Sequence, residues 1–298
     1  MARMFPPSNT LFNFGKNYKY IHPMMKIPFI AFISFLLISP AHAQYFYKDF
    51  SSNRQAQQNM AAYQEQKVRT IRFKSLEADG TASEGFFMEK KLSKDYKTST
   101  LVSRSAYSAP MLSVSKFNSK GQLIETKDTS EISSALYTFS YDESDRLLKT
   151  YSTIISSDED YISTITEEHL YEYGDDFYPE KMWLIKNQKD TTLILFSKDE
   201  VGNITIEKDT KTGRKYYYYY DSKSRITDIV HVNEYTEKMI PDYLFEYNAS
   251  GQLTQMTTIE GSTDFTIWKY HYENGLRTAE KAYDRNRKLL GTIEYQYK

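Results

Sequence analysis

The sequence predicts an all-β protein, an antiparallel β-hairpin repeat meander with one short N-terminal helix. Two observations predict this fold. Strand-like aromatic segments recur about every 25 residues, and each ends in a turn signal that is followed by an aliphatic residue. Self-similarity at a period of this size is typical of repeat architectures. We expect the hairpins to form one curled sheet.

The clearest hairpin lies in Tyr216–Thr227, whose sequence is YYYYYDSKSRIT. Side chains alternate along an extended chain, so the first, third and fifth tyrosines share one face. Asp221 suits the first position of a type I turn, because its carboxylate accepts a bond from a backbone N–H two residues on. A three-residue loop would place Tyr220 opposite Ile226.

The same pattern recurs along most of the chain. An aromatic residue at position 0 is followed by Asp or Asn at +1, a Gly-like residue at +4 and an aliphatic residue at +6. Positions 117, 141, 173, 198, 220, 247 and 272 are the zero positions, separated by 24, 32, 25, 22, 27 and 25 residues. Lys198 replaces the aromatic residue in one copy, the copy at Tyr173 is degenerate and the copy at Tyr272 is shortened. Tyr283 begins a further match, with Asp284, Arg287 and Leu289. Glycine suits +4 because a three-residue hairpin loop ends at a positive φ. The structural turn residues singled out are Gly121, Asp142, Gly202, Asp221, Asn248 and Gly251.

The end of the chain matches half of a repeat. Tyr295 and Tyr297 fit the strand that opens a unit, but no turn follows them. We expect this half-unit to be a closing strand. It would pair with the strand that leads into Tyr283, or with N-terminal strands if the sheet closes.

These residues resemble the YD-repeat (RHS-type) family, whose units read roughly Y-x-Y-D-x-x-G-R-L. FSYDESDRL at 139–147 and YYYDSKSRI at 218–226 are close matches, with Phe139, Asp145 and Ser224 departing from the pattern. The resemblance covers about residues 113–298. It implies a long, curled antiparallel sheet; in that family such sheets can wrap around a toxin domain. About seven units are too few for a closed shell by that analogy.

The first 43 residues predict a leader with a secretory signal peptide. Lys26 precedes the apolar run Ile27–Ile38, and Ala41-His42-Ala43 is an A-x-A cleavage site. We expect cleavage after Ala43 and a mature chain that begins at Gln44. The alternative, a single anchoring helix, is disfavoured because a membrane span needs about 20 apolar residues.

Composition then limits the function of the mature chain. The leader holds four of the 38 Lys and Arg and none of the 39 Asp and Glu, which leaves a net charge of −5. A mildly acidic chain lacks the basic surface that nucleic-acid binding requires. There is no cysteine, hence no disulfide, thiolate metal site or lipid anchor on cysteine. We expect an exported protein, periplasmic or extracellular at the cell surface, without stable membrane insertion.

The mature chain is expected to form one continuous domain in two parts. Residues 44–112 hold a helix at Ser52–Gln66 and a degenerate first β unit, and residues 113–298 hold the repeats. Ala56, Met60 and Tyr63 recur at helical spacing, so this helix is expected to cover the first sheet edge.

No residue pattern points clearly to catalysis. The carboxylate clusters at 158–160, 167–168 and 175–176 could serve general acid–base chemistry in a glycan-active enzyme, but they lie in or near predicted turns. His169, His231 and His271 occupy different repeat registers, which disfavours a shared metal site. We therefore assign no catalytic, cofactor-binding or metal-binding residue.

The tyrosines suggest binding instead. The main prediction is a non-catalytic secreted protein, with either a scaffolding role or a Tyr-rich sheet that binds a glycan or a cell-surface protein. Its speculative binding residues are Tyr217, Tyr219, Trp268 and Tyr270. The alternative is a small outer-membrane β-barrel, because alternating strands with many tyrosines also fit aromatic girdles. A mean hydropathy of −0.64 counts against that alternative.

Overall fold

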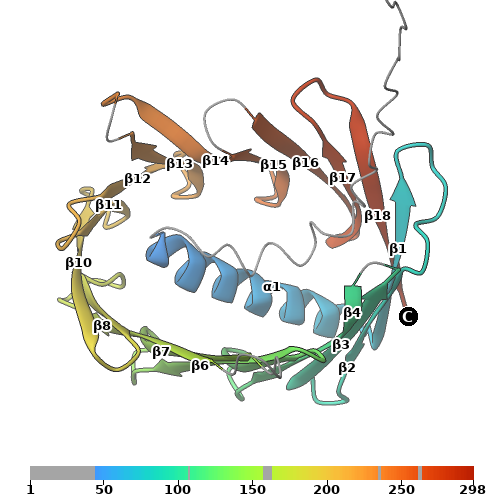
Figure 1. Ribbon diagram of the computed structural model, residues 1–298, viewed down its shortest axis with the longest axis horizontal. Coiled ribbons are helices and arrows are strands. Elements are labelled where there is room, and N and C mark those ends of the chain that lie inside the picture. The colour runs from blue at the N-terminus through green and yellow to red at the C-terminus, as the bar shows by residue number, and fades with distance from the viewer. Residues whose placement is uncertain (1–43, 107, 157–162, 234–235, 261–263) are drawn as a thin grey trace, which may run out of the picture.

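The computed structural model describes residues 44–106, 108–156, 163–233, 236–260 and 264–298. Within these residues, eighteen strands form one closed antiparallel β-barrel (Figure 1). The predicted leader and its cleavage site lie outside the described residues.

Neighbouring strands in the barrel follow one another in the chain, and the last strand returns to the first. The first nine strands are β1 (Thr70–Glu77), β2 (Phe87–Leu92), β3 (Thr98–Ser105), β4 (Ser108–Phe117), β5 (Leu123–Thr129), β6 (Ser133–Tyr141), β7 (Leu147–Ser156), β8 (Thr164–Glu172) and β9 (Lys181–Lys186). The other nine are β10 (Asp190–Lys198), β11 (Ile204–Asp209), β12 (Lys215–Tyr220), β13 (Ile226–Val232), β14 (Met239–Tyr247), β15 (Leu253–Glu260), β16 (Asp264–Glu273), β17 (Leu276–Tyr283) and β18 (Leu289–Tyr297).

The prediction of an open, curled sheet is wrong. β18 pairs with β17 on one side and with β1 on the other, from Ile71 opposite Tyr297 to Glu77 opposite Gly291. The terminal half-unit is therefore a closing strand, as expected. Closure removes both sheet edges, whose unpaired N–H and C=O groups would otherwise be free to associate.

All the repeat turns except the one after Tyr173 are followed by a β-bulge, which explains how the sheet curves. Tyr220 lies opposite Ile226, as predicted, but Tyr219 lies opposite Asp228, so one residue between them is unpaired. The same shift occurs where Tyr141 pairs with Leu147 and where Tyr247 pairs with Leu253. A bulge bends the strand and increases its twist. Repeated around the sheet, these bulges supply the curvature that a barrel needs.

The turns have the expected backbone conformation. Gly121, Gly202 and Gly251 have φ of 78°, 89° and 85°. Asp145 and Ser224 occupy the same +4 position with φ of 64° and 56°, although they are not glycine. A side chain at such φ is strained, so these two turns form at some cost.

The position-0 tyrosines link each repeat to the preceding one. Tyr220 donates its hydroxyl proton to the Ile204 carbonyl at 2.6 Å, and Tyr247 donates to Ile226 at 2.9 Å. The acceptor is the +6 residue of the preceding repeat in each case. Two further bonds of this kind run from Tyr141 to Leu123 and from Tyr173 to Leu147. A related bond runs from Tyr297, in the closing strand, to the carbonyl of Arg277, five residues after Tyr272. Tyrosine is therefore preferred to phenylalanine at position 0 because its hydroxyl satisfies a neighbouring carbonyl.

An arginine at +5 adds a second link between repeats. Arg225 Nε donates to Asp221 at 2.6 Å, and Nη1 donates to the Asn248 carbonyl of the next turn at 3.2 Å. Its guanidinium also lies 4.6 Å from the ring centre of Tyr247, in cation–π geometry. Arg146 makes the equivalent contacts.

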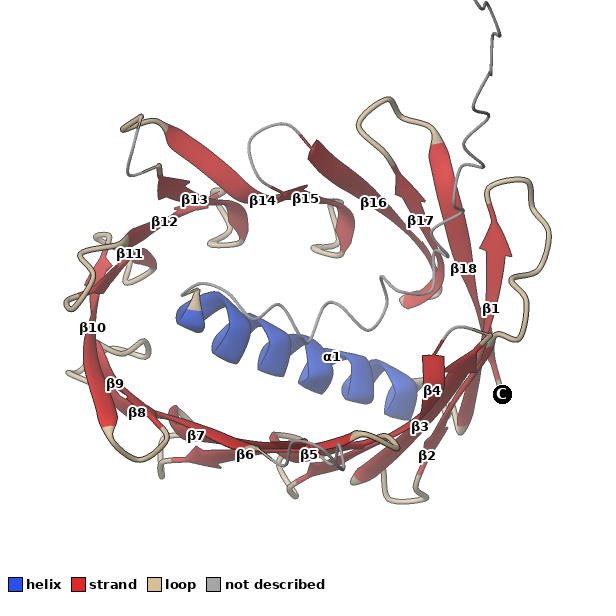
Figure 2. Cartoon of the chain, viewed as in Figure 1, coloured by secondary structure: helices blue, strands red, loops and turns tan. Residues whose placement is uncertain are grey.

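The helix lies inside the barrel and does not cover a sheet edge. A π-helical turn, Tyr47–Ser51, leads into α1, Ser52–Glu65, which crosses the lumen (Figure 2). The predicted helix is thus present with nearly its predicted bounds, but its place is different, because a closed barrel has no edge to cover. No described helix is long and apolar enough to span a membrane.

Candidate functional site

The site with the most buried polar chemistry is the place where the N-terminal segment enters the barrel. We call Gln44–Glu65 the plug. Gln44 and Phe46 are buried, and the segment lies within the ring of strands (Figure 2). Because the polar side chains that anchor the plug are more than 80 residues away from it in the chain, tertiary folding alone brings them together.

Glu207 on β11 anchors the start of the plug. Its carboxylate accepts hydrogen bonds from the backbone N–H of Tyr45 at 3.1 Å and of Phe46 at 3.0 Å, and from the Tyr218 hydroxyl at 2.9 Å. The residue is 1% exposed. Burial raises the pKa of the Glu207 carboxyl, although the three donors oppose that rise. A buried carboxyl of this kind is stable only while its partners stay in place.

Asp49 is the second anchor, and it receives its bonds from β7 and β8. Its Oδ2 lies 2.5 Å from His169 Nδ1, 2.6 Å from the Tyr171 hydroxyl and 3.3 Å from Thr150 Oγ1. The other ring nitrogen of His169 lies 3.0 Å from Glu167 Oε1. Burial acts to lower the pKa of His169, but the two carboxylates outweigh it and raise that pKa to about 10. His169 is therefore an imidazolium at neutral pH and joins the plug to the wall.

Aromatic packing surrounds these polar anchors. The Phe46 ring meets the rings of Tyr178 and Tyr218 edge-on, with centroids 5.3 Å apart in both pairs. Tyr47 packs on Tyr243 and on Phe245 at 5.4 Å. Each such pair adds about 0.5–1.5 kcal/mol beyond the apolar area that it buries.

Helix α1 continues the contact across the lumen. Asn53 is buried and donates to the Tyr141 hydroxyl at 2.7 Å, and Arg54 donates to the Tyr178 hydroxyl at 2.6 Å. Met60 and Tyr63 are buried at its other end. They pack in a cluster with Val68, Ile71, Leu92, Tyr96, Phe117 and Leu123.

The residues around Glu207 and Asp49 hold a segment of chain in place. Glu167 points into the lumen, but Glu168 lies on the outer face and pairs with Lys149. Asp176 forms an ion pair with Lys198 at 3.0 Å, and the cluster at 158–160 lies wholly outside the described residues. No group of three or more potential metal ligands is found in the described ranges.

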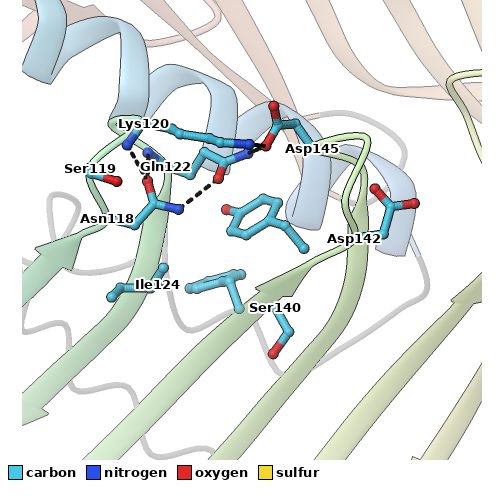
Figure 3. A pocket seen from close by; sticks show the side chains of 10 residues that line it. Asn118, Ser119, Lys120, Gln122, Ile124, Ser140, Asp142 and Asp145 are labelled. Atoms are coloured by element: carbon cyan, nitrogen blue, oxygen red, sulfur yellow. Dashed lines mark hydrogen bonds and ion pairs between the residues drawn. The ribbon is translucent and has the colours of Figure 1, made fainter.

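A groove of about 330 Å³ lies between the first two repeat turns (Figure 3). Its polar residues bond to one another: Lys120 Nζ lies 2.6 Å from Asp145, and Asn118 donates to Gln122 at 2.7 Å. These contacts are those of the turns themselves. The charged and amide groups named here are therefore engaged within the turns.

The predicted binding residues lie on opposite faces of the wall. Trp268 and Tyr270 point inward and are 4% and 7% exposed. Tyr217 and Tyr219 point outward, and Tyr219 is 46% exposed. The structure does not bring these four side chains together in one surface.

Sequence reasoning missed both anchors of the plug. Glu207 stands at an inward position of β11, opposite the buried Tyr216. An acid at such a position is a signal, because glutamate is almost never fully buried without a partner. Asp49 gave no comparable signal, since it precedes the helix in an irregular segment.

Comparisons with known proteins do not identify a family. No family model matches the chain, and no curated protein matches it. Among solved structures, a porin-like protein from Bacteroides uniformis is similar at 12% identity over 78% of this chain and 96% of that one, with a TM-score of 0.32. The TcdB2-TccC3-Cdc42 and TcdB2-TccC3 structures are similar at 9% and 8% identity, over 79% and 75% of this chain and 17% and 19% of those chains, with TM-scores of 0.26 and 0.24.

The closed barrel bears on the two predicted functions. It supports the alternative, a small outer-membrane β-barrel, better than the main prediction of a Tyr-rich sheet presented for binding. The reason is geometric: closure turns most of the repeat aromatics inward, where they pack on the plug and on one another.

Proposed function

We propose that this chain is an exported β-barrel of the cell envelope, associated with the outer membrane and sealed by its own N-terminal plug. The observation that carries the proposal is the pairing of β1 with β18, which closes eighteen strands into one barrel. The predicted signal peptide supports export. The buried plug supports a structural role and counts against an open channel.

The ion pairs on the outer face of the barrel favour binding at the surface of the membrane over insertion into the bilayer. Arg72 pairs with Glu89 at 2.8 Å and Lys116 with Glu125 at 2.7 Å, both between neighbouring strands on the outer face. A Lys or Arg facing lipid at the bilayer midplane costs about 2–4 kcal/mol. A wall with such pairs is stable in water, so we place the barrel at the membrane surface.

A non-catalytic role remains part of the proposal. The paired and solvated carboxylates described above support it. Recognition of a glycan or a cell-surface protein remains a prediction, and the outward Tyr217 and Tyr219 are the two predicted residues that could contribute.

Fractionation of cells that export the full chain tests this function. We expect the protein in the envelope fraction, released by high salt or carbonate without detergent, and migrating faster on a gel before boiling than after. Extraction by detergent only would place the wall within the bilayer. Recovery in the cytoplasm or wholly in the soluble periplasm, at low salt, would overturn the proposal.

A further inference from the structure

One side of the outer wall, over β11–β17, differs from the rest. Ile206, Tyr217, Val230 and Pro241 occupy successive outward positions on β11–β14, each opposite the next. A second outward row lies beside it and consists of Tyr219, Asp228, Leu244, Thr257 and Ile267. Tyr219 and the nearby Met239 are about half exposed, Val230 and Thr257 are buried between their neighbours, and the other members of the two rows are partly exposed. We call these two rows the tyrosine band (Figure 2 shows its strands, β11 to β16, along the upper wall).

Lysine pairs flank the tyrosine band on both sides. Lys208 lies directly opposite Lys215, and Lys269 lies directly opposite Lys281. Like charges at facing positions destabilise a sheet. In the described residues none of these four lysines forms an ion pair; Lys269 does lie 5.8 Å from the ring centre of Tyr283.

The opposite wall of the barrel has the charge arrangement that stabilises a sheet, with opposite charges at neighbouring positions. There, facing or diagonal positions carry opposite charges, as in Lys116–Glu125 and Lys181–Glu172. The band itself holds one acid, Asp228, and Glu246 lies at its border. The arrangement of the lysines is therefore a local feature of one wall, where a cost to stability is retained beside the exposed Tyr219 and Met239 and a partly exposed apolar row.

We propose that the tyrosine band docks on an anionic lipid surface, with the lysine pairs binding the headgroups. Tyrosine rings have an apolar body and a polar tip that suit the interface between headgroups and acyl chains, and lysines bury their stems while the ammonium stays in water. Each lysine near an anionic surface strengthens binding roughly fivefold. An acidic polysaccharide is less suited, because the outer wall of a barrel is convex and its band is partly aliphatic.

This inference rests on the proposed function and specifies which wall faces the membrane. Binding to vesicles tests it, with 30% phosphatidylglycerol in phosphatidylcholine compared with pure phosphatidylcholine. Two double variants are compared with the wild type. The lysine variant carries Lys208→Glu and Lys215→Glu, and the tyrosine variant carries Tyr217→Ser and Tyr219→Ser. The matched control, Lys94→Glu with Lys127→Glu, makes the same change in net charge at two lysines that form no ion pair in the described residues.

We expect the wild type to bind anionic vesicles at least tenfold more tightly than neutral ones and to be released by 0.5 M salt. The lysine variant should lose tenfold or more. The tyrosine variant should lose several-fold, and the control should stay within twofold of the wild type. Unchanged gel mobility before boiling would show that each variant is folded, since all the substituted side chains are outward or in a turn.

Equal losses in the control and the lysine variant would overturn the inference, as would wild-type binding without preference for anionic vesicles. Alginate binding that is tighter than vesicle binding, and lost in the same variants, would assign the band to an acidic polymer. If the chain fractionates with the envelope while the lysine variant does so equally, only this inference fails. A chain that is absent from the envelope contradicts the proposed function itself.

Discussion

At the scale of single residues, the repeat turns depend on one backbone conformation at +4. Gly251 adopts φ of 85° there, and an added side chain would meet only Arg225 Nη1, at 3.9 Å. Arg287 adopts φ of 62° at the same position of another turn. Space is therefore available at +4, and the dihedral angle alone decides which residues fit well.

We predict that Gly251→Val destabilises the fold by about 1–3 kcal/mol, because a β-branched residue at positive φ is strained. Arg287→Gly should instead stabilise it, by up to about 1 kcal/mol, since it relieves the same strain. Urea unfolding of both variants measures the two effects. Changes of the same sign would contradict the turn geometry.

His169 is the residue where stability should depend on pH. Its pKa of about 10 in the folded protein lies above its ordinary value of 6.5, because Asp49 and Glu167 face its two ring nitrogens. The folded state therefore holds the proton more tightly than the unfolded state. The contribution of His169 to the free energy of unfolding is therefore fully present below pH 6.5 and is lost as the pH rises toward 10.

We predict that His169→Gln flattens this dependence between pH 6.5 and 10, with the variant less stable at pH 6 and closer to the wild type at pH 10. Thermal melts across that range provide the measurement. His271→Gln is the control, because His271 is exposed on the outer face. A wild-type slope that survives in His169→Gln would show that another group is responsible.

At the scale of the elements, the hairpins are joined by contacts that the repeat pattern encodes. The hydroxyls of four position-0 tyrosines, Tyr141, Tyr173, Tyr220 and Tyr247, reach the +6 carbonyl of the preceding repeat, as Tyr247 reaches Ile226. The +5 arginine reaches forward to the next turn, as Arg225 reaches Asn248. Each repeat thus stabilises both neighbours, which is the general behaviour of repeat arrays.

We predict that Tyr247→Phe destabilises the barrel by about 1–2 kcal/mol, because it removes a hydrogen bond and leaves a part-buried carbonyl unsatisfied. Tyr219→Phe is the matched control. Its hydroxyl lies outward, with a weak contact to the Met239 sulfur at 3.9 Å, so its loss should change stability by less than about 0.5 kcal/mol. Equal effects of the two variants on the urea midpoint would contradict the proposed link.

At the scale of the whole molecule, closure and the plug depend on each other. The wall turns its aromatic face inward, and Phe46 with Tyr47 packs against that face at the polar anchors Glu207 and Asp49. A barrel of this width leaves a lumen that wall side chains do not fill by themselves. The plug occupies part of that space, so the core of the protein forms between plug and wall.

We predict that deletion of Ile293–Lys298 opens the barrel, because it removes most of the pairing between β18 and β1. The truncated protein should lose stability and associate through the exposed edges of β1 and β17. Light scattering and thermal melting measure both effects. The exposed, outward-facing Gln296 on the same strand supplies the control, Gln296→Ala, which should behave as the wild type. A monomeric truncation with the wild-type melting temperature would show that closure contributes nothing.

Local patterns in the sequence determined the elements of this protein. Asp221 and the residue at +4 specify a turn whatever surrounds them, and the alternation of Tyr216 and Tyr217 specifies two faces of a strand. Helix formers specify α1 in the same way. Such preferences act over a few residues, which is why the sequence alone predicts them well.

Tertiary structure alone decided closure, the place of the helix and the anchored plug. Ile71 meets Tyr297, and Phe46 meets Glu207, across 226 and 161 residues of chain. No periodicity records such contacts, because they depend on how the small bend at each β-bulge accumulates around the whole sheet. The turns can therefore be predicted from the local sequence, whereas closure of the barrel results from all the bends acting together.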